Sequence, residues 1–214
     1  MSQIAHKINS SRSFNFFRIK DIPVNKPLIN YFIKTETWAS SLVLISVFII
    51  CQYALSQGKF FLPDNPVPVT LQTFGILLMG SLYGFRLSVL SISAYLLLGL
   101  IGAPVFQGHN GGVDYFFGVT GGYLLGFLLC AAVNSFLSVR GFKGGLSIWA
   151  MIFSNCLIYI IAVIWLSFFN FSWPQNGQML SQAVYPFLIG DFIKLIVASS
   201  VISFLWKIAQ RKEK

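Results

Sequence analysis

Apolar runs separated by short polar stretches make up most of the chain. Six runs are each close to the length of about 20 residues that a helix needs to cross a bilayer: 38–56, 67–84, 86–104, 113–137, 146–169 and 183–206. The second run starts in Pro66-Val-Pro68 and contains polar residues. It is therefore predicted to begin either as an irregular segment or directly as a helix. The pattern predicts an all-α membrane protein, a bundle of six transmembrane helices.

Charged residues then predict how the bundle is oriented. Residues 1–37 are polar and basic, which indicates a cytoplasmic arm; a cleaved signal peptide is the less favoured alternative, because the first apolar run starts late. With the N-terminus inside, the inner loops and the tail hold these basic residues: Arg86, Arg140, Lys143, Lys207, Arg211, Lys212 and Lys214. Lys59 is the only basic residue in the predicted outer loops. The positive-inside rule therefore predicts two cytoplasmic termini, with a basic arm at 1–37, a bundle at 38–206 and a basic tail at 207–214.

Composition narrows the function classes. The chain is 56% hydrophobic and 10% charged, against about 25% charged residues in soluble domains. The net charge of +9 lies mostly beside apolar runs, which indicates topology and not nucleic acid. No phosphate-binding loop, serine elbow or paired carboxylates occur, so we expect neither an enzyme nor an ATP-driven motor. Cys51, Cys130 and Cys156 lie in apolar runs and are predicted to be buried, without a disulfide or a metal site.

Asp191 and Lys194 interrupt the last apolar run. A charge at mid-membrane costs about 3 kcal/mol or more, so such residues usually have a function. A spacing of three places both side chains on one helix face. They are predicted either to neutralise each other as a structural ion pair or to share a polar ligand.

Other polar groups fall at the same, outer end of the predicted bundle. Thr70 and Gln72 start the second run, where the alternative is that they only satisfy a frayed helix end. Phe106 and Gln107 open a glycine-rich outer loop of the kind that closes over a ligand. Asn155 lies in the middle of the fifth run, where it is a candidate for the site or for interhelical packing.

Aromatic residues are the expected walls of such a pocket, and glycines are the expected packing face. The candidates for the walls are Phe74, Phe106, Tyr115, Tyr123, Tyr159 and Phe192. An apolar wall with a few polar groups suits a small ligand. Gly118, Gly122 and Gly126 recur at every fourth position, which predicts close helix packing.

Four ordered motifs resemble the BioY family, the biotin-binding S components of energy-coupling factor transporters. They are Pro66-Val-Pro-Val-Thr-Leu-Gln-Thr-Phe-Gly-Ile-Leu-Leu-Met-Gly80, Tyr95-Leu-Leu-Leu-Gly-Leu-Ile-Gly-Ala-Pro-Val-Phe106, Gly121-Gly-Tyr-Leu-Leu-Gly-Phe127 and Gly190-Asp-Phe-Ile-Lys194. The resemblance implies that Asp191 and Lys194 contribute to biotin binding near the outer face.

The resemblance also implies a function. It implies biotin uptake across a bacterial inner membrane, with biotin as transported ligand and not as cofactor, and with a coupling subunit and ATPase subunits on separate chains. Asp191 is expected to accept a ureido N–H of biotin, and Lys194 to donate to its carbonyl or carboxylate. Two alternatives stay open: a stand-alone secondary transporter of a small polar solute that uses Asp191 as a proton-coupled carboxylate, and a membrane scaffold or enzyme subunit without its own ligand.

Overall fold

The computed structural model describes residues 26–33, 35, 37–169 and 171–212. Most of the predicted N-terminal arm therefore lies outside the described residues. The described part of the arm contains a short 3₁₀ helix, η2 (Leu28–Tyr31), in which Leu28 is fully buried. The ring of Tyr31 meets the ring of Trp206 edge to face, so this part packs against the bundle.

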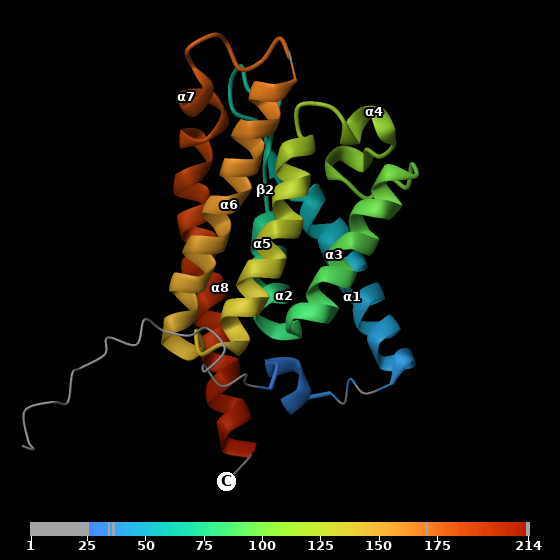
Figure 1. The fold of residues 1–214 in the computed structure, drawn as a ribbon, viewed down its shortest axis with the longest axis vertical. Helices are drawn as coiled ribbons and strands as arrows, with labels where there is room; N and C mark the ends of the chain where they lie inside the picture. The colour runs from blue at the N-terminus through green and yellow to red at the C-terminus, as the bar shows by residue number, and fades with distance from the viewer. Residues whose placement is uncertain (1–25, 34, 36, 170, 213–214) are drawn as a thin grey trace, which may run out of the picture.

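Six long helices form the bundle (Figure 1). They are α1 (Trp38–Gln57), α2 (Gln72–Tyr83), α3 (Phe85–Leu100), α5 (Gly121–Val139), α6 (Ser147–Phe168) and α8 (Tyr185–Lys212). The shorter elements are the helices η3 (Gln107–His109), α4 (Val113–Phe116), η4 (Gly144–Leu146) and α7 (Met179–Ala183). Each predicted apolar run contains one long helix, and the described part of the chain has 4 helices long and apolar enough to cross a membrane.

Two of the predicted runs are not continuous helices. In the second run, β2 (Val69–Thr70) pairs antiparallel with β1 (Lys59–Phe60), and α2 starts only at Gln72. The prolines at 66 and 68 explain the irregular start, because proline has no backbone N–H to donate. The fourth run divides into α4 and α5, and between them the indole N–H of Trp165 donates to the Gly118 carbonyl at 3.1 Å.

Helix α5 lies in the middle of the bundle, with α6 against its glycine face (Figure 1). A Cβ atom at Gly122 would lie 2.9 Å from Cα of Ala162, and one at Gly126 would lie 2.8 Å from Cα of Ile158. Both distances are too short for any larger residue, since both partners are backbone atoms. The predicted packing role is confirmed for Gly122 and Gly126, whereas Gly118 lies before the start of α5 and a Cβ atom there would meet the backbone of Asp114 and Tyr115.

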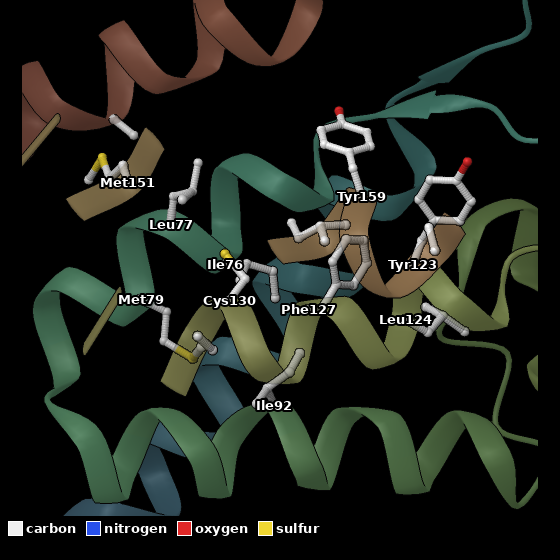
Figure 2. Packing of buried hydrophobic residues seen from close by; sticks show 14 of the residues in the cluster. Ile76, Leu77, Met79, Ile92, Tyr123, Leu124, Phe127, Cys130, Met151 and Tyr159 are labelled. Carbon is white, nitrogen blue, oxygen red and sulfur yellow. The ribbon is translucent and has the colours of Figure 1, made fainter. Parts of the chain in front are cut away.

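The buried cluster and the outer helix faces are both apolar. Ile76, Leu77, Ile92 and Cys130 are fully buried in the cluster that Figure 2 shows. Cys51 and Cys156 are exposed, so the prediction that all three cysteines are buried is wrong for these two. The sequence alone does not distinguish a residue in the protein core from one that faces lipid, because lipid tails are as apolar as a protein core.

The two ends of the bundle differ in charge. The α2–α3 turn, the α5–α6 turn and the end of α8 lie at one end, and the β1–β2 hairpin, α4 and α7 lie at the other (Figure 1). The first end carries these described basic residues: Arg86, Arg140, Lys143, Lys207, Arg211 and Lys212. We call this end the basic end and the opposite end the hairpin end.

Candidate functional site

The carboxylate of Asp191 is the centre of a buried polar cluster. Its side chain is 5% exposed. The Lys194 ammonium lies 2.8 Å from Oδ1, and the Thr73 hydroxyl donates to the same oxygen at 3.1 Å. The amide of Asn155 donates to Oδ2 at 3.0 Å, and the Tyr159 hydroxyl donates to it at 2.6 Å. A carboxylate has about four acceptor positions, so all of them are occupied.

The ammonium of Lys194 retains one donor. It donates to Asp191 Oδ1 and, at 3.1 Å, to the hydroxyl of Thr73. An ammonium has three N–H groups, which leaves one for another partner. Asp191 and Lys194 both line a cavity. The two residues therefore neutralise each other and also face a cavity, so the ion pair does not exclude a shared ligand.

The cavity collects six of the eight predicted site residues. Its lining consists of Val67, Pro68, Val69, Thr70, Gln72, Thr73, Gln107, Tyr115, Thr120, Tyr123, Leu124, Phe127, Ile158, Tyr159, Phe187, Asp191 and Lys194. The other two predicted residues lie behind the lining. Phe106 is fully buried and stacks on the Tyr115 ring at 5.4 Å, and Asn155 contacts Asp191 from behind.

The start of α2 supplies one polar edge of the cavity. The Thr70 hydroxyl donates to Gln72 Oε1 at 3.1 Å and accepts from the Gln72 backbone N–H at 3.3 Å. The Gln72 amide donates to the Tyr95 hydroxyl at 2.8 Å, and that hydroxyl donates to the Val105 carbonyl at 3.0 Å. These hydrogen bonds satisfy polar groups at the start of α2. They also fix the side chains of Thr70 and Gln72, which line the cavity, so capping the helix does not exclude a place in the site.

The glycine-rich loop supplies another edge through Gln107. The Lys59 ammonium donates to Gln107 Oε1 at 3.1 Å. The side chain of Gln57 accepts from the Gly108 backbone N–H at 3.1 Å and donates to the Phe106 carbonyl at 3.0 Å. Gly108 has a φ of +68°, which favours glycine. The end of α1 therefore fastens this loop over the cavity.

Aromatic rings form most of the remaining wall. The Tyr123 hydroxyl donates to the Ala183 carbonyl at 2.7 Å, and its ring lies 5.9 Å from that of Phe187. Tyr123 and Tyr159 stand at one side of the buried cluster, and their hydroxyls point away from it (Figure 2). Burial raises the pKa of the Tyr115 hydroxyl above the ordinary tyrosine value.

Several lining residues were not anticipated from the sequence. Phe127 and Phe187 are among them, and each lies four positions from a predicted residue, Tyr123 and Asp191 respectively. A spacing of four on a helix gives the same face, so this signal was present. Phe74 and Phe192, in contrast, do not reach the cavity, and Phe192 is 56% exposed on the outer face of α8.

The lining of the cavity is suited to binding a small ligand. Among the described residues, no group of three or more potential metal ligands occurs. The lining instead combines a charged donor, hydroxyl groups that can donate or accept, and aromatic walls. This combination is typical of a site for a small ligand with an apolar body and a few polar atoms.

The sequence model of the BioY family matches residues 26–211. The chain belongs to the BioY family. Its relatives include the probable biotin transporter BioY of Rickettsia prowazekii, which is 29% identical over 179 residues, covering 81% of this chain and 87% of the relative. The biotin transporter BioY of Thermotoga maritima is 34% identical over 140 residues, covering 65% of this chain and 81% of the relative.

A solved structure agrees with this membership. The crystal structure of the S-component for biotin from an ECF-type ABC transporter matches with a TM-score of 0.70 at 27% identity, covering 82% of this chain and 95% of the other. Family membership and several apolar helices make this chain a multi-pass membrane protein. The family match begins at residue 26 and so includes η2.

Proposed function

We propose that this chain is the biotin-binding S component of an energy-coupling factor transporter, which captures biotin at the outer side of the membrane for uptake. The observation that carries the proposal is the cavity at the Asp191–Lys194 pair, with one ammonium donor to spare and aromatic walls around it. The related proteins named as biotin transporters and the biotin S-component structure support it.

The chemistry of biotin fits the lining. Biotin has a planar ureido group with two N–H donors and one carbonyl, an apolar ring body and a carboxylate. The spare N–H of Lys194 is placed to donate to the carbonyl or the carboxylate, as a charge-assisted hydrogen bond. The oxygens of Thr73 and Tyr159 keep lone pairs that accept from the ureido N–H groups.

The full occupancy of Asp191 changes the role we assign to it. Its four contacts leave no acceptor position for a ureido N–H. Asp191 therefore positions Lys194, Thr73 and Tyr159, and these three contact the ligand. Thr70, Gln72, Gln107 and Tyr123 complete the binding surface, and Phe106 and Asn155 hold that surface from behind.

We also infer the orientation and the partners. The basic end lies in the cytoplasm, the six long helices each cross the bilayer, and both termini are cytoplasmic in a bacterial inner membrane. The site is then nearer the outer face. A coupling subunit and ATPase subunits supply the energy, because the sequence has no phosphate-binding loop of its own.

Binding of labelled biotin by the purified protein tests the ligand. We expect saturable submicromolar binding, weakened strongly in Asp191→Asn. Binding that is micromolar or weaker, and the same in Asp191→Asn, would contradict the proposal.

Uptake by whole cells tests the energy source. We expect uptake to stop when the partner ATPase is deleted. Uptake that continues without the ATPase, and collapses when an uncoupler is added, would instead support the secondary transporter.

A further inference from the structure

A second hollow lies at the basic end of the bundle. It runs between η2, the start of α1 and the α2–α3 turn. We call it the Arg86 groove, and its lining consists of Pro27, Asn30, Thr35, Thr37, Trp38, Ser41, Leu42, Ile45, Tyr83, Gly84, Phe85, Arg86, Leu87, Leu90 and Val139. Its volume of about 530 Å³ is within the range of about 300–1,000 Å³ for ligand sites.

One part of the groove is polar and cationic. Arg86 is exposed in the first turn of α3. The hydroxyls of Thr35 and Thr37 lie on the opposite side, where Thr35 donates to Asn30 Oδ1 at 2.6 Å and Thr37 caps α1 by accepting from the Ser40 N–H at 3.2 Å. The Arg86 guanidinium is therefore the charged group that this part offers to an anion.

The other part of the groove is apolar and open to the membrane side. Leu42 is 59% exposed on α1, and Leu90 is 52% exposed on α3. Ile45 and Leu87 line the groove between these two helices. Trp38 is 84% exposed at the start of α1, and tryptophan in membrane proteins is enriched at the level of the lipid headgroups.

We propose that the Arg86 groove binds one anionic glycerophospholipid of the cytoplasmic leaflet. The lipid phosphate pairs with the Arg86 guanidinium, which can hold two phosphate oxygens at once. An acyl chain lies along Leu42 and Leu90. A lipid fits better than an apolar protein helix because the groove combines a cation with an apolar channel, and because the other basic residues of this end attract anionic headgroups. The proposal rests on the inferred orientation and not on biotin.

Native mass spectrometry of the full chain, released from detergent micelles, tests this. Phosphatidylglycerol and phosphatidylcholine with identical acyl chains are the two probes. We expect one phosphatidylglycerol to remain bound in preference to phosphatidylcholine. Arg86→Gln should weaken that binding roughly fivefold, the effect of one cation near a membrane surface. Arg211→Gln is the matched control, because Arg211 is exposed at the same end but outside the lining.

A second variant tests the apolar part. Ser41 lines the groove, so Ser41→Phe should fill it and lower the binding of both lipids. Thermal unfolding and the elution profile of each variant establish that it is folded. Equal binding of the two lipids, or an equal loss in Arg86→Gln and Arg211→Gln, would overturn the proposal. Phosphatidylglycerol binding unchanged in Arg86→Gln would also overturn it, and would indicate that another partner, such as the coupling subunit, covers this groove.

Discussion

The two walls of the proposed biotin cavity are held in different ways. The helical wall comes from α2, α6 and α8, and its contacts converge on one buried carboxylate. The loop wall comes from Gln107, whose loop is fastened by the half-buried Gln57 and the exposed Lys59. Hydrogen bonds in partly exposed positions contribute less than buried, charge-assisted ones. We therefore expect the helical wall to be fixed before binding and the loop wall to be the part that opens.

We infer from this difference that the two walls have separate roles in binding. A wall fixed before binding gives affinity and selectivity, because no side chain has to be ordered when the ligand arrives. A loop held by part-buried contacts is expected to govern entry and release. Substitutions in the helical wall should therefore change the affinity for biotin and the stability of the protein. Substitutions in the loop wall should mainly change the rate of biotin release.

The largest expected effect comes from Asp191→Ala. It leaves the Lys194 ammonium buried without its counter-charge, which costs about 3–5 kcal/mol. We expect a large fall in the thermal unfolding temperature and no detectable biotin binding. The double variant Asp191→Leu with Lys194→Leu is the control, since it removes both charges. It should recover most of the stability and none of the binding; a double variant as unstable as the single one would contradict the ion-pair account.

A smaller effect is expected from Asn155→Leu. Asn155 does not line the cavity, but it donates to Asp191 Oδ2. Loss of a hydrogen bond to a charged group costs about 1.5–3 kcal/mol, so we expect biotin affinity to fall by about tenfold or more in calorimetric titration. Asn134→Leu is the matched control, because Asn134 is a fully buried asparagine that donates to the Leu77 carbonyl, away from the cavity. Asn134→Leu should lower the stability of the protein and leave its affinity for biotin unchanged. An equal loss of biotin affinity in both variants would contradict the positioning role of Asn155.

The smallest effect is expected from Gln57→Ala. This change removes the contacts of Gln57 to Gly108 and Phe106 and loosens the loop wall. We expect biotin to dissociate a few times faster in stopped-flow measurements, since a neutral hydrogen bond contributes about 1 kcal/mol. Gln178→Ala, which changes an exposed glutamine of another loop, should leave the rate unchanged. Slower association with unchanged dissociation would argue against the loop as the part that opens.

The sequence predicted the long elements and the charged pair, for clear physical reasons. Apolar length defines a membrane helix, and the three-residue spacing places Asp191 and Lys194 on one face wherever that helix lies. The glycine spacing likewise predicted close helix packing at Gly122 and Gly126, and the structure places α6 against them. These features depend only on neighbours along the chain.

The arrangement around Asp191 could not be predicted in the same way. Thr73, Asn155 and Tyr159 meet its carboxylate only because of how α2 and α6 are rotated about their axes. Those rotations follow from packing across the bundle. The adjacent residues Phe106 and Gln107 show the same limit, because only Gln107 faces the cavity. The break between α4 and α5 involves Trp165, which is distant in sequence.

We expect Lys194, held in place by Asp191, to be the charged donor that binds biotin. Calorimetric titration of biotin into the purified protein and into Lys194→Met tests it most directly, because Asp191 keeps three other donors in that variant. We predict one submicromolar site per chain in the natural protein and binding about 100-fold weaker in the variant. Equal affinity in the two proteins, or no saturable binding in the natural one, would contradict it.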